Sequence, residues 1–317
     1  MDPLSDVIRA VRLNGAYFYF VEAASPWSVC TVAARELVPR VLPDAEHLIP
    51  YHILVTGSCW GGLEDEEQVQ MKPGDVIVFP HGEPHVMSSM KWRGRRDGTG
   101  VLTESQRYAD TVFLGPSGTR DTTFVCGFLG CDLRPFNPLL ASLPRRLYVP
   151  GITSGWLSQF PAQAVAESRI GRVGHLTMLT RMAELMFIEA VRYYLEHHTS
   201  AHHGWLAGLV DSIVGPALTH LHERPDHPWT LAELARASGS SRTVLAERFT
   251  RVVGVSPMLY LRRWRLQLAA NQLYRSPAKV ATIASQAGYE SEAAFSRAFK
   301  QETGLAPALW RRARQQG

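Results

Sequence analysis

The segment Val280–Pro307, VATIASQAGYESEAAFSRAFKQETGLAP, repeats a pattern that the chain has already used in Leu231–Pro257, LAELARASGSSRTVLAERFTRVVGVSP. The matched pairs, offset by 49 residues before the turn and 50 after it, are Ala235/Ala284, Gly239/Gly288, Leu245/Phe295, Phe249/Phe299, Gly254/Gly304 and Pro257/Pro307. Only two copies are present, and each has its own turn residues. The repeat therefore indicates a duplicated module and not a solenoid.

Each copy is predicted to form two helices around a glycine-centred turn. Gly239 and Gly288 tolerate the left-handed backbone that a sharp turn requires, and Ser241 and Ser291 are placed to cap the second helix. In that second helix the apolar residues recur at i and i+4, which is typical of a helix-turn-helix. A generic helical hairpin would explain the packing residues, but not a duplication with matched turns.

Charge is divided unevenly along the 317 residues. The whole chain has 33 Lys+Arg against 29 Asp+Glu, a net charge of +4. Residues 229–317 alone hold 14 Lys+Arg and 5 Asp+Glu, whereas residues 1–228 hold 19 and 24, so the net charges are +9 and −5. A basic end on an acidic body indicates contact with a polyanion, although a solvated basic surface is the alternative.

Residues from about 211 to 314 resemble the DNA-binding domain of the AraC/XylS family of bacterial transcription regulators. The resemblance rests on SGSSRTVLAERF and on IASQAGYESEAAFSRAFKQETGLAPALWRR. It implies two helix-turn-helix units joined by a rigid helix, here Ser256 to about Arg275. It also implies that the two recognition helices enter successive major grooves, which lie about 34 Å apart.

Outward positions on the two recognition helices give the candidate base contacts. These are Arg242, Thr243, Ala246 and Glu247 in the first copy and Glu292, Ala293, Ser296 and Arg297 in the second. Arginine can bond both O6 and N7 of guanine, and glutamate can accept from the cytosine amino group. Lys300 and three arginines of the joining helix, Arg262, Arg263 and Arg265, are the candidate phosphate contacts, which position without specifying. Outward polar residues that are merely solvated are the alternative at each position.

The first half of the chain has short β-rich segments separated by Gly and Pro from about Tyr17 to Asp132, which predicts a small β-barrel. GDVIVFPHGEPH fits the second cupin motif, G(x)5PxGxxH, at Gly74, Pro80, Gly82 and His85. One branch of the AraC/XylS family resembles this chain along nearly its whole length and places a cupin-like sensor before the DNA-binding domain. The expected fold class is α+β, with an N-terminal cupin-like jelly roll followed by an all-α double helix-turn-helix domain.

A metal site in the barrel is an open alternative. HLIPYHILVTG lacks the H-x-H of a metal-bearing first cupin motif, because His47 and His52 are five residues apart. His52, His81, His85 and Cys126 could still meet around a divalent ion or line an effector pocket, since imidazole and thiolate suit zinc or similar metals. The alternative is that they are barrel-lining or turn residues, so the cofactor stays unknown.

The cysteines are too few for a disulfide framework, since the chain has four in total. Cys126 and Cys131 lie five apart, an odd spacing that points them to opposite faces of a strand. A redox role for Cys126 and Cys131 is one interpretation. Buried inert thiols are the other.

Three domains are expected: residues 1–150 as the sensor, 151–208 as a helical linker or dimerisation segment, and 209–317 as the DNA-binding domain. The histidines at 197, 198, 202 and 203 are interpreted as solvated surface, and residues 94–100 as a mobile loop.

The function predicted is a cytoplasmic transcription regulator that binds double-stranded promoter DNA. A small molecule, metal or oxidant sensed in the barrel is expected to modulate that binding. RNA polymerase and a second copy of the chain are expected partners, and no apolar run is long enough for a membrane helix. The alternative is a metal-dependent cupin enzyme with an accessory DNA-binding domain.

Overall fold

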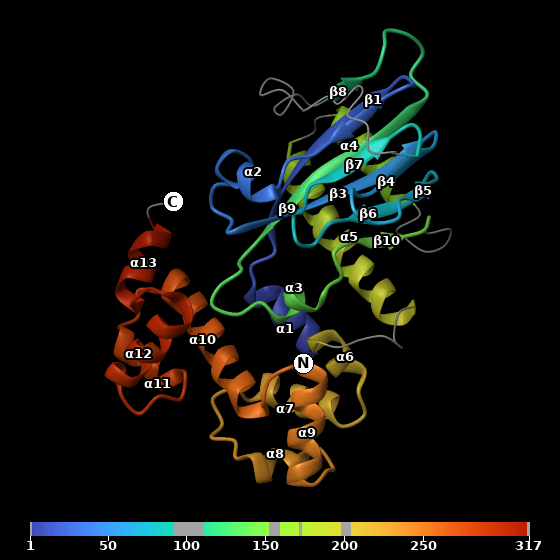
Figure 1. The fold of residues 1–317 in the computed structure, drawn as a ribbon. Helices are drawn as coiled ribbons and strands as arrows, with labels where there is room; N and C mark the ends of the chain where they lie inside the picture. Colours follow the sequence, from blue (N-terminus) through green and yellow to red (C-terminus); the bar gives the residue numbers. More distant parts are fainter. Residues whose placement is uncertain (1, 92–110, 152–158, 171–172, 198–203, 316–317) are drawn as a thin grey trace. The chain divides into compact units, whose positions relative to one another are not determined.

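The computed structural model describes residues 2–91, 111–151, 159–170, 173–197 and 204–315 (Figure 1). The chain divides into two compact units that interleave along the sequence. We call residues 13–131 with 143–197 the β-rich unit, and residues 1–12, 132–142 and 198–317 the helical unit. The expected ranges 1–150, 151–208 and 209–317 stay a prediction. That residues 1–12 and 132–142 pack with the C-terminal helices is a feature that the sequence did not indicate.

The β-rich unit contains two sheets. The six-stranded sheet has the order β10-β6-β3-β9-β1-β8, with β10(Leu147–Val149), β6(Val76–Val78), β3(His47–Thr56), β9(Thr122–Cys131), β1(Asn14–Ala23) and β8(Thr111–Leu114). The four-stranded sheet has the order β2-β7-β4-β5, with β2(Ser28–Cys30), β7(His85–Ser88), β4(Cys59–Leu63) and β5(Val69–Met71).

One core lies between these sheets. It takes Leu54 and Phe124 from the six-stranded sheet and Leu63 and Met87 from the four-stranded sheet. The barrel-like sandwich that the β-rich rhythm predicted is therefore confirmed. The helices described in this unit are α2(Ala34–Val41), α4(Phe160–Ile170) and α5(His175–His197), and α5 packs against β1 and β10.

β3 and β9 form the centre of the six-stranded sheet and are buried along almost their whole length. Their antiparallel register places His52 directly opposite Cys126. β7 belongs to the other sheet and supplies His85. The fold thus brings together three side chains that are far apart in sequence.

The helical unit is a set of short helices around α10(Pro257–Arg275). The others are α1(Pro3–Ala10), α3(Pro138–Ser142), α6(Trp205–Val210), α7(Val214–Glu223), α8(Leu231–Ala237), α9(Arg242–Val253), α11(Val280–Gln286), α12(Glu292–Thr303) and α13(Pro307–Gln315). Helices α8 and α9 form the first helix-turn-helix unit, and α11 and α12 form the second.

The turns and caps have the expected local geometry. Gly239 and Gly288 have φ of 67° and 76°, in the left-handed region that favours glycine. The Ser241 hydroxyl accepts a hydrogen bond from the Val244 N–H at 3.3 Å, and the Ser291 hydroxyl accepts one from the Ala294 N–H at 3.2 Å. Each recognition helix therefore starts at its predicted serine, because that side chain satisfies a backbone donor the helix leaves unpaired.

Candidate nucleic-acid interface and barrel site

The first recognition helix, α9, is held by Leu245 and Phe249, which are both fully buried. Arg242, Thr243 and Glu247 are exposed on the opposite side, whereas Ala246 is half-buried. Three of the four predicted base-contact residues of this helix are therefore accessible to a duplex.

The second recognition helix, α12, repeats this arrangement with Phe295 and Phe299 buried. Four of its predicted DNA contacts are exposed: Glu292, Ala293, Arg297 and Lys300. Ser296 is half-buried, like its counterpart Ala246. Arg297 occupies the position that Glu247 holds in α9, so the two helices present a cation and an anion at equivalent places.

Sequence reasoning missed three exposed side chains on these helices, Val244, Arg251 and Gln301. Val244 is a large apolar residue that is 44% exposed, and it lies one residue after Thr243. At 100° per residue, Val244 and Arg251 fall on the side of α9 away from Leu245 and Phe249. Applying that rotation to every position would have found them.

The three candidate phosphate contacts of α10 differ in their exposure and in the hydrogen bonds and ion pairs that they already form within the protein. Arg262 is exposed. Arg263 is half-buried, with its Nε 3.0 Å from Glu302 Oε1 of α12. Arg265 donates from Nη2 to the His227 carbonyl at 2.7 Å and from Nε to the Pro225 carbonyl, and burial lowers the pKa of its guanidinium. Among these three arginines, Arg262 is therefore the one best placed to meet a phosphate.

A further arginine on α9 has a structural partner. Arg248 is half-buried and donates from Nε to both carboxylate oxygens of Asp211, at 2.8 and 3.1 Å. The same carboxylate accepts from the Ile213 and Val214 N–H groups at the start of α7. Arg248 therefore fixes α9 to the rest of the helical unit.

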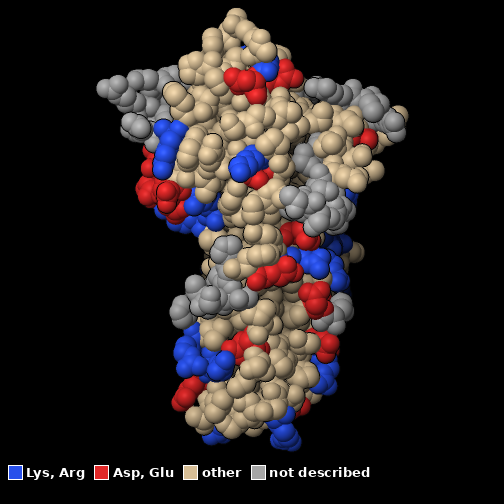
Figure 2. Space-filling view, turned by 90° about the vertical axis from the view of Figure 1, so that its right-hand side faces the viewer, with Lys and Arg blue, Asp and Glu red and all other residues tan. Residues whose placement is uncertain are grey.

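Basic and acidic side chains are interspersed on the face shown in Figure 2. On this face the positive charge does not form one continuous stripe.

In the β-rich unit, three of the four candidate barrel residues lie in direct contact. His52 Nδ1 is 2.8 Å from Cys126 Sγ, and His52 Nε2 is 2.7 Å from His85 Nε2. His85 Nδ1 lies 2.9 Å from the carbonyl oxygen of Glu83 and 2.9 Å from the Thr31 hydroxyl. All three side chains of this row, His52, His85 and Cys126, are buried.

The contacts of this row fix the positions of its protons. A carbonyl oxygen only accepts, so His85 Nδ1 carries a proton and donates to Glu83. In the neutral ring His85 Nε2 then accepts from His52 Nε2–H, and His52 Nδ1 accepts from the Cys126 thiol. We call this row the thiol–imidazole relay, and it runs Cys126, His52, His85 and the Glu83 carbonyl.

Burial keeps every member of the relay neutral. It lowers the pKa of His85 to about 4 and that of His52 well below its ordinary value, and the neighbouring His85 imidazole lowers the pKa of His52 further. Burial likewise raises the pKa of the Cys126 thiol well above its ordinary value. Near neutral pH the relay therefore holds protons without net charge.

The relay does not fit a resident metal ion. His52 uses its two ring nitrogens, on opposite sides of the ring, for Cys126 and His85, so the three donors do not converge on a point. Two nitrogens that ligate one tetrahedral zinc lie about 3.3 Å apart. The 2.7 Å between the two Nε2 atoms is the spacing of a hydrogen bond. Among the described residues, no three His, Cys, Asp or Glu side chains are arranged to hold a metal.

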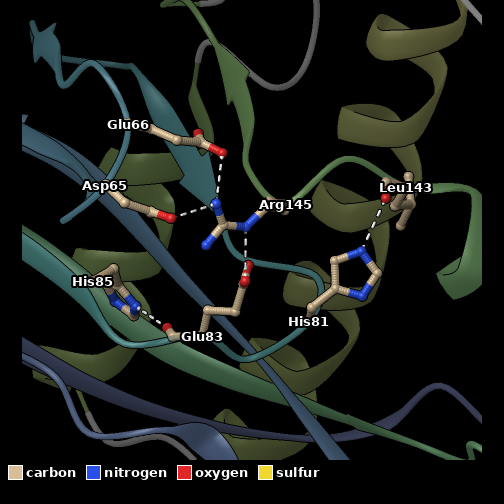
Figure 3. A network of polar contacts seen from close by, with 7 residues as sticks. All are labelled: Asp65, Glu66, His81, Glu83, His85, Leu143 and Arg145. Atoms are coloured by element: carbon tan, nitrogen blue, oxygen red, sulfur yellow. Dashed lines mark hydrogen bonds and ion pairs between the residues drawn. The ribbon is translucent and has the colours of Figure 1, made fainter.

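His81 lies apart from the other three candidate barrel residues. Its Nε2 is 2.9 Å from the Leu143 carbonyl, on the far side of the loop that leads to His85 (Figure 3). The same loop is held by Arg145, which donates to Glu83 Oε1 at 2.7 Å, to Asp65 at 2.9 Å and to Glu66 at 3.3 Å. The expectation that His81 would join His52 and His85 is corrected, because its turn directs the ring toward the segment before β10.

None of the four cysteines, all of which lie in the described residues, is disulfide-bonded. Cys126 belongs to the core between the sheets, whereas Cys131 lies at the end of the same continuous strand with the opposite parity. Because side chains alternate along a strand, Cys126 and Cys131 lie on opposite faces of β9, as their spacing predicted. A redox role for either thiol stays a prediction. Of the histidines interpreted as solvated surface, His197 ends α5, and positions 198, 202 and 203, like the loop 94–100, fall outside the described residues.

Comparison with known proteins matches a different family model to each part of the sequence. A family model described as Cupin matches residues 2–196, and one described as Helix-turn-helix domain matches residues 234–313. An AraC-like transcription regulator of Streptomyces antibioticus is 31% identical over 98% of this chain and 99% of its own length. The transcriptional regulator AlkR of Acinetobacter baylyi is 26% identical over 98% and 99%.

Among solved structures, a regulator with an AraC-type DNA-binding domain from Chromobacterium violaceum covers 35% of this chain and 97% of its own length. Its sequence identity is 24% and its TM-score 0.33. Within the part of the chain that the structure describes, no helix is both long and apolar enough to cross a membrane.

Proposed function

The chain belongs to the AraC-like transcription regulators, with a cupin domain before an AraC-type helix-turn-helix domain, and from that premise we propose that α9 and α12 read bases while the barrel senses an effector. DNA binding and transcription regulation come with the family. Its relatives are transcription regulators, which argues against a metal-dependent enzyme. The observation that carries the base-reading proposal is the pair of capped recognition helices with exposed Glu247 and Arg297 at equivalent positions.

Specific reading by α12 is tested with Arg297→Ala. A bidentate arginine–guanine contact contributes about 1–3 kcal/mol of discrimination, so the variant should lose base preference at one or two positions of a duplex selected from random sequence. Fluorescence anisotropy against single-base variants of that duplex measures the change.

Arg262→Ala is the comparison, because Arg262 is the exposed one of the three predicted phosphate contacts on α10. A lost phosphate contact should weaken all sequences alike and reduce the slope of log affinity against log salt by about 1. If the two variants change base preference and salt slope identically, the division into base and phosphate contacts is wrong.

An apolar base contact is expected from Val244. Its exposed methyl groups suit the C5 methyl of thymine, which deoxyuridine lacks. Replacing one thymine of the selected duplex by deoxyuridine should lower the affinity of the wild-type chain a few-fold, and Val244→Ala should abolish that difference at the same position. Leu309→Ala, which removes an exposed apolar side chain from α13, is the matched control. A uracil scan to which no position responds would exclude this contact.

We propose that the thiol–imidazole relay is the part of the barrel that responds to the effector. Its support is the buried chain of short contacts from Cys126 to Glu83, which any ligand, metal or oxidant that engages the thiol would have to break. The test compares DNA affinity of the full chain with and without zinc chloride and hydrogen peroxide, in the wild type and in Cys126→Ala. A response of equal size in both proteins would count against the relay.

RNA polymerase and a second copy of the chain stay proposed partners, and the cytoplasm stays the proposed location of a regulator that works on promoter DNA. The apolar side chains exposed on α5, Leu176, Met178 and Leu185, support a homodimer. Sedimentation of the full chain over a range of concentrations tests it.

A further inference from the structure

Two segments that flank strands of the β-rich unit pack inside the helical unit. The first is residues 1–12, which include α1 and end two residues before β1. The second is residues 132–142, which follow β9 directly and include α3. We call residues 132–142 the strap.

A buried amide on α10 is satisfied by these two segments. The Gln267 side chain, at a residue only 1% exposed, accepts from the Phe136 N–H at 2.9 Å and donates to the Ala10 carbonyl at 2.8 Å. Asn271, one turn further along α10, donates to the same carbonyl at 2.8 Å. A buried amide that loses its hydrogen-bond partners is destabilising, so Gln267 favours the arrangement in which both segments lie on α10.

The strap reaches both helix-turn-helix units. Near the first unit, the Phe136 ring packs edge-on against Tyr260 with ring centroids 5.4 Å apart, and Tyr260 in turn packs against Phe249 of α9. Near the second unit, Arg134 lies 5.6 Å over the Trp310 ring of α13 and 3.5 Å from the Thr303 carbonyl at the end of α12. The strap therefore bridges the two units across α10.

A buried ion pair joins residues 1–12 to the strap. Arg12 donates to the carboxylate of Asp132 from Nε at 2.6 Å and from Nη2 at 2.9 Å, and both side chains are less than 10% exposed. The Arg12 guanidinium also lies 4.1 Å over the ring of Tyr274 in the last turn of α10. Separating the two side chains would leave a buried charge without a partner, which is strongly unfavourable. The ion pair therefore holds residues 1–12 and the strap together.

We propose that residues 1–12 and the strap form a clamp that fixes the angle between the two helix-turn-helix units, with Gln267 as its positioning residue. The clamp touches neither recognition surface, so it sets the spacing at which two DNA segments are read and leaves the reading of each segment unchanged. Its ends continue into β1 and β9, and β9 carries Cys126. If the barrel senses an effector, as proposed above, the signal would reach DNA as a change of preferred spacing.

The test needs no effector, so its failure is separable from a failure of sensing. The DNA affinity of the full chain is measured for duplexes that contain the two DNA segments read by the two helix-turn-helix units, with 0, 1, 2, 3 or 5 base pairs inserted between these segments. It is also measured for duplexes that contain only one of the two DNA segments. The wild type should prefer one spacing by about tenfold or more. Gln267→Leu should narrow that preference to about threefold or less and leave single-segment affinity within about twofold.

Gln272→Leu is the matched control, since Gln272 is an exposed glutamine on the same helix. It should retain the wild-type spacing preference. Arg134→Ala removes an exposed side chain from the strap and tests the clamp again in case Gln267→Leu unfolds. The proposal is overturned if a folded Gln267→Leu or Arg134→Ala protein keeps the full spacing preference. The proposal is also overturned if either variant loses as much affinity for duplexes with one DNA segment as for duplexes with both.

Discussion

Phe299→Ala should lower the free energy of unfolding of the second helix-turn-helix unit by about 3–5 kcal/mol, because it removes a fully buried ring from a closed aromatic core. The Phe299 ring packs against Phe295 with centroids 5.4 Å apart and edge-on against Trp310 at 5.6 Å. The vacated volume is lined by rings that cannot collapse into it without leaving their rotamers. Urea unfolding followed by circular dichroism measures the loss.

DNA binding should fail with the core. Arg297 and Lys300 are carried by the same helix, so loosening α12 removes their common geometry. Lys300→Ala is the neighbouring control, since Lys300 is exposed and its loss should change stability by less than about 0.5 kcal/mol. Phe249→Ala is the equivalent change in the first unit, and its effect on DNA should fall on the other segment of the duplex. A loss of less than about 1 kcal/mol for Phe299→Ala would contradict the closed core.

The duplicated segment was predictable because its signals are local. Ser241 and Ser291 bond to donors three residues away, and Gly239 and Gly288 need only a backbone conformation that other residues rarely adopt. Such features depend on nearest neighbours along the chain. They hold whatever the rest of the protein does.

In the barrel, residue chemistry indicated partners but not geometry. The structure brings His52, His85 and Cys126 into contact, which the sequence had left open. Which atoms of these side chains come into contact depends on the register of β3 against β9, which places His52 opposite Cys126. One residue of slip would have turned His52 to the other face, and no periodicity in the sequence fixes that register.

The clamp could not be predicted from the sequence. Gln267 and Ala10 are 257 residues apart, and Arg12 and Asp132 are 120 apart. Nothing near Gln267 in sequence distinguishes it from the exposed Gln272 five residues later. For the same reason the sequence predicts that Arg265 points outward, although its guanidinium donates hydrogen bonds to the carbonyls of Pro225 and His227. Polar pairs over such separations follow from the packing of whole elements.

Acidification should destabilise the β-rich unit through His85. Its folded pKa is about 4 and the ordinary value is 6.5, so between these pH values the unfolded chain binds a proton that the folded chain refuses. Stability is therefore complete above about pH 6.5 and falls as the pH drops toward 4. At 1.36 kcal/mol per pKa unit, His85 alone accounts for a loss of about 3 kcal/mol, and the lowered pKa of His52 acts in the same direction.

The unit must be observed by itself, because the pKa of His222 in the helical unit is also lowered by burial, to about 3, and adds a slope of the same sign. Pulse-labelling hydrogen exchange across a urea series, quantified on peptides from β3 and β9, isolates the β-rich unit.

His85→Phe can keep the stacking on Phe79, now at 3.8 Å between ring centroids, but cannot titrate. This variant should be less stable at pH 7, since the His52 N–H loses its acceptor, and should lose about 3 kcal/mol less between pH 6.5 and 4. Phe79→Leu weakens the same packing without removing the titrating group, so it should lower stability equally at all pH values. If His85→Phe keeps the wild-type slope, the neutral relay is not what makes the barrel sensitive to acid.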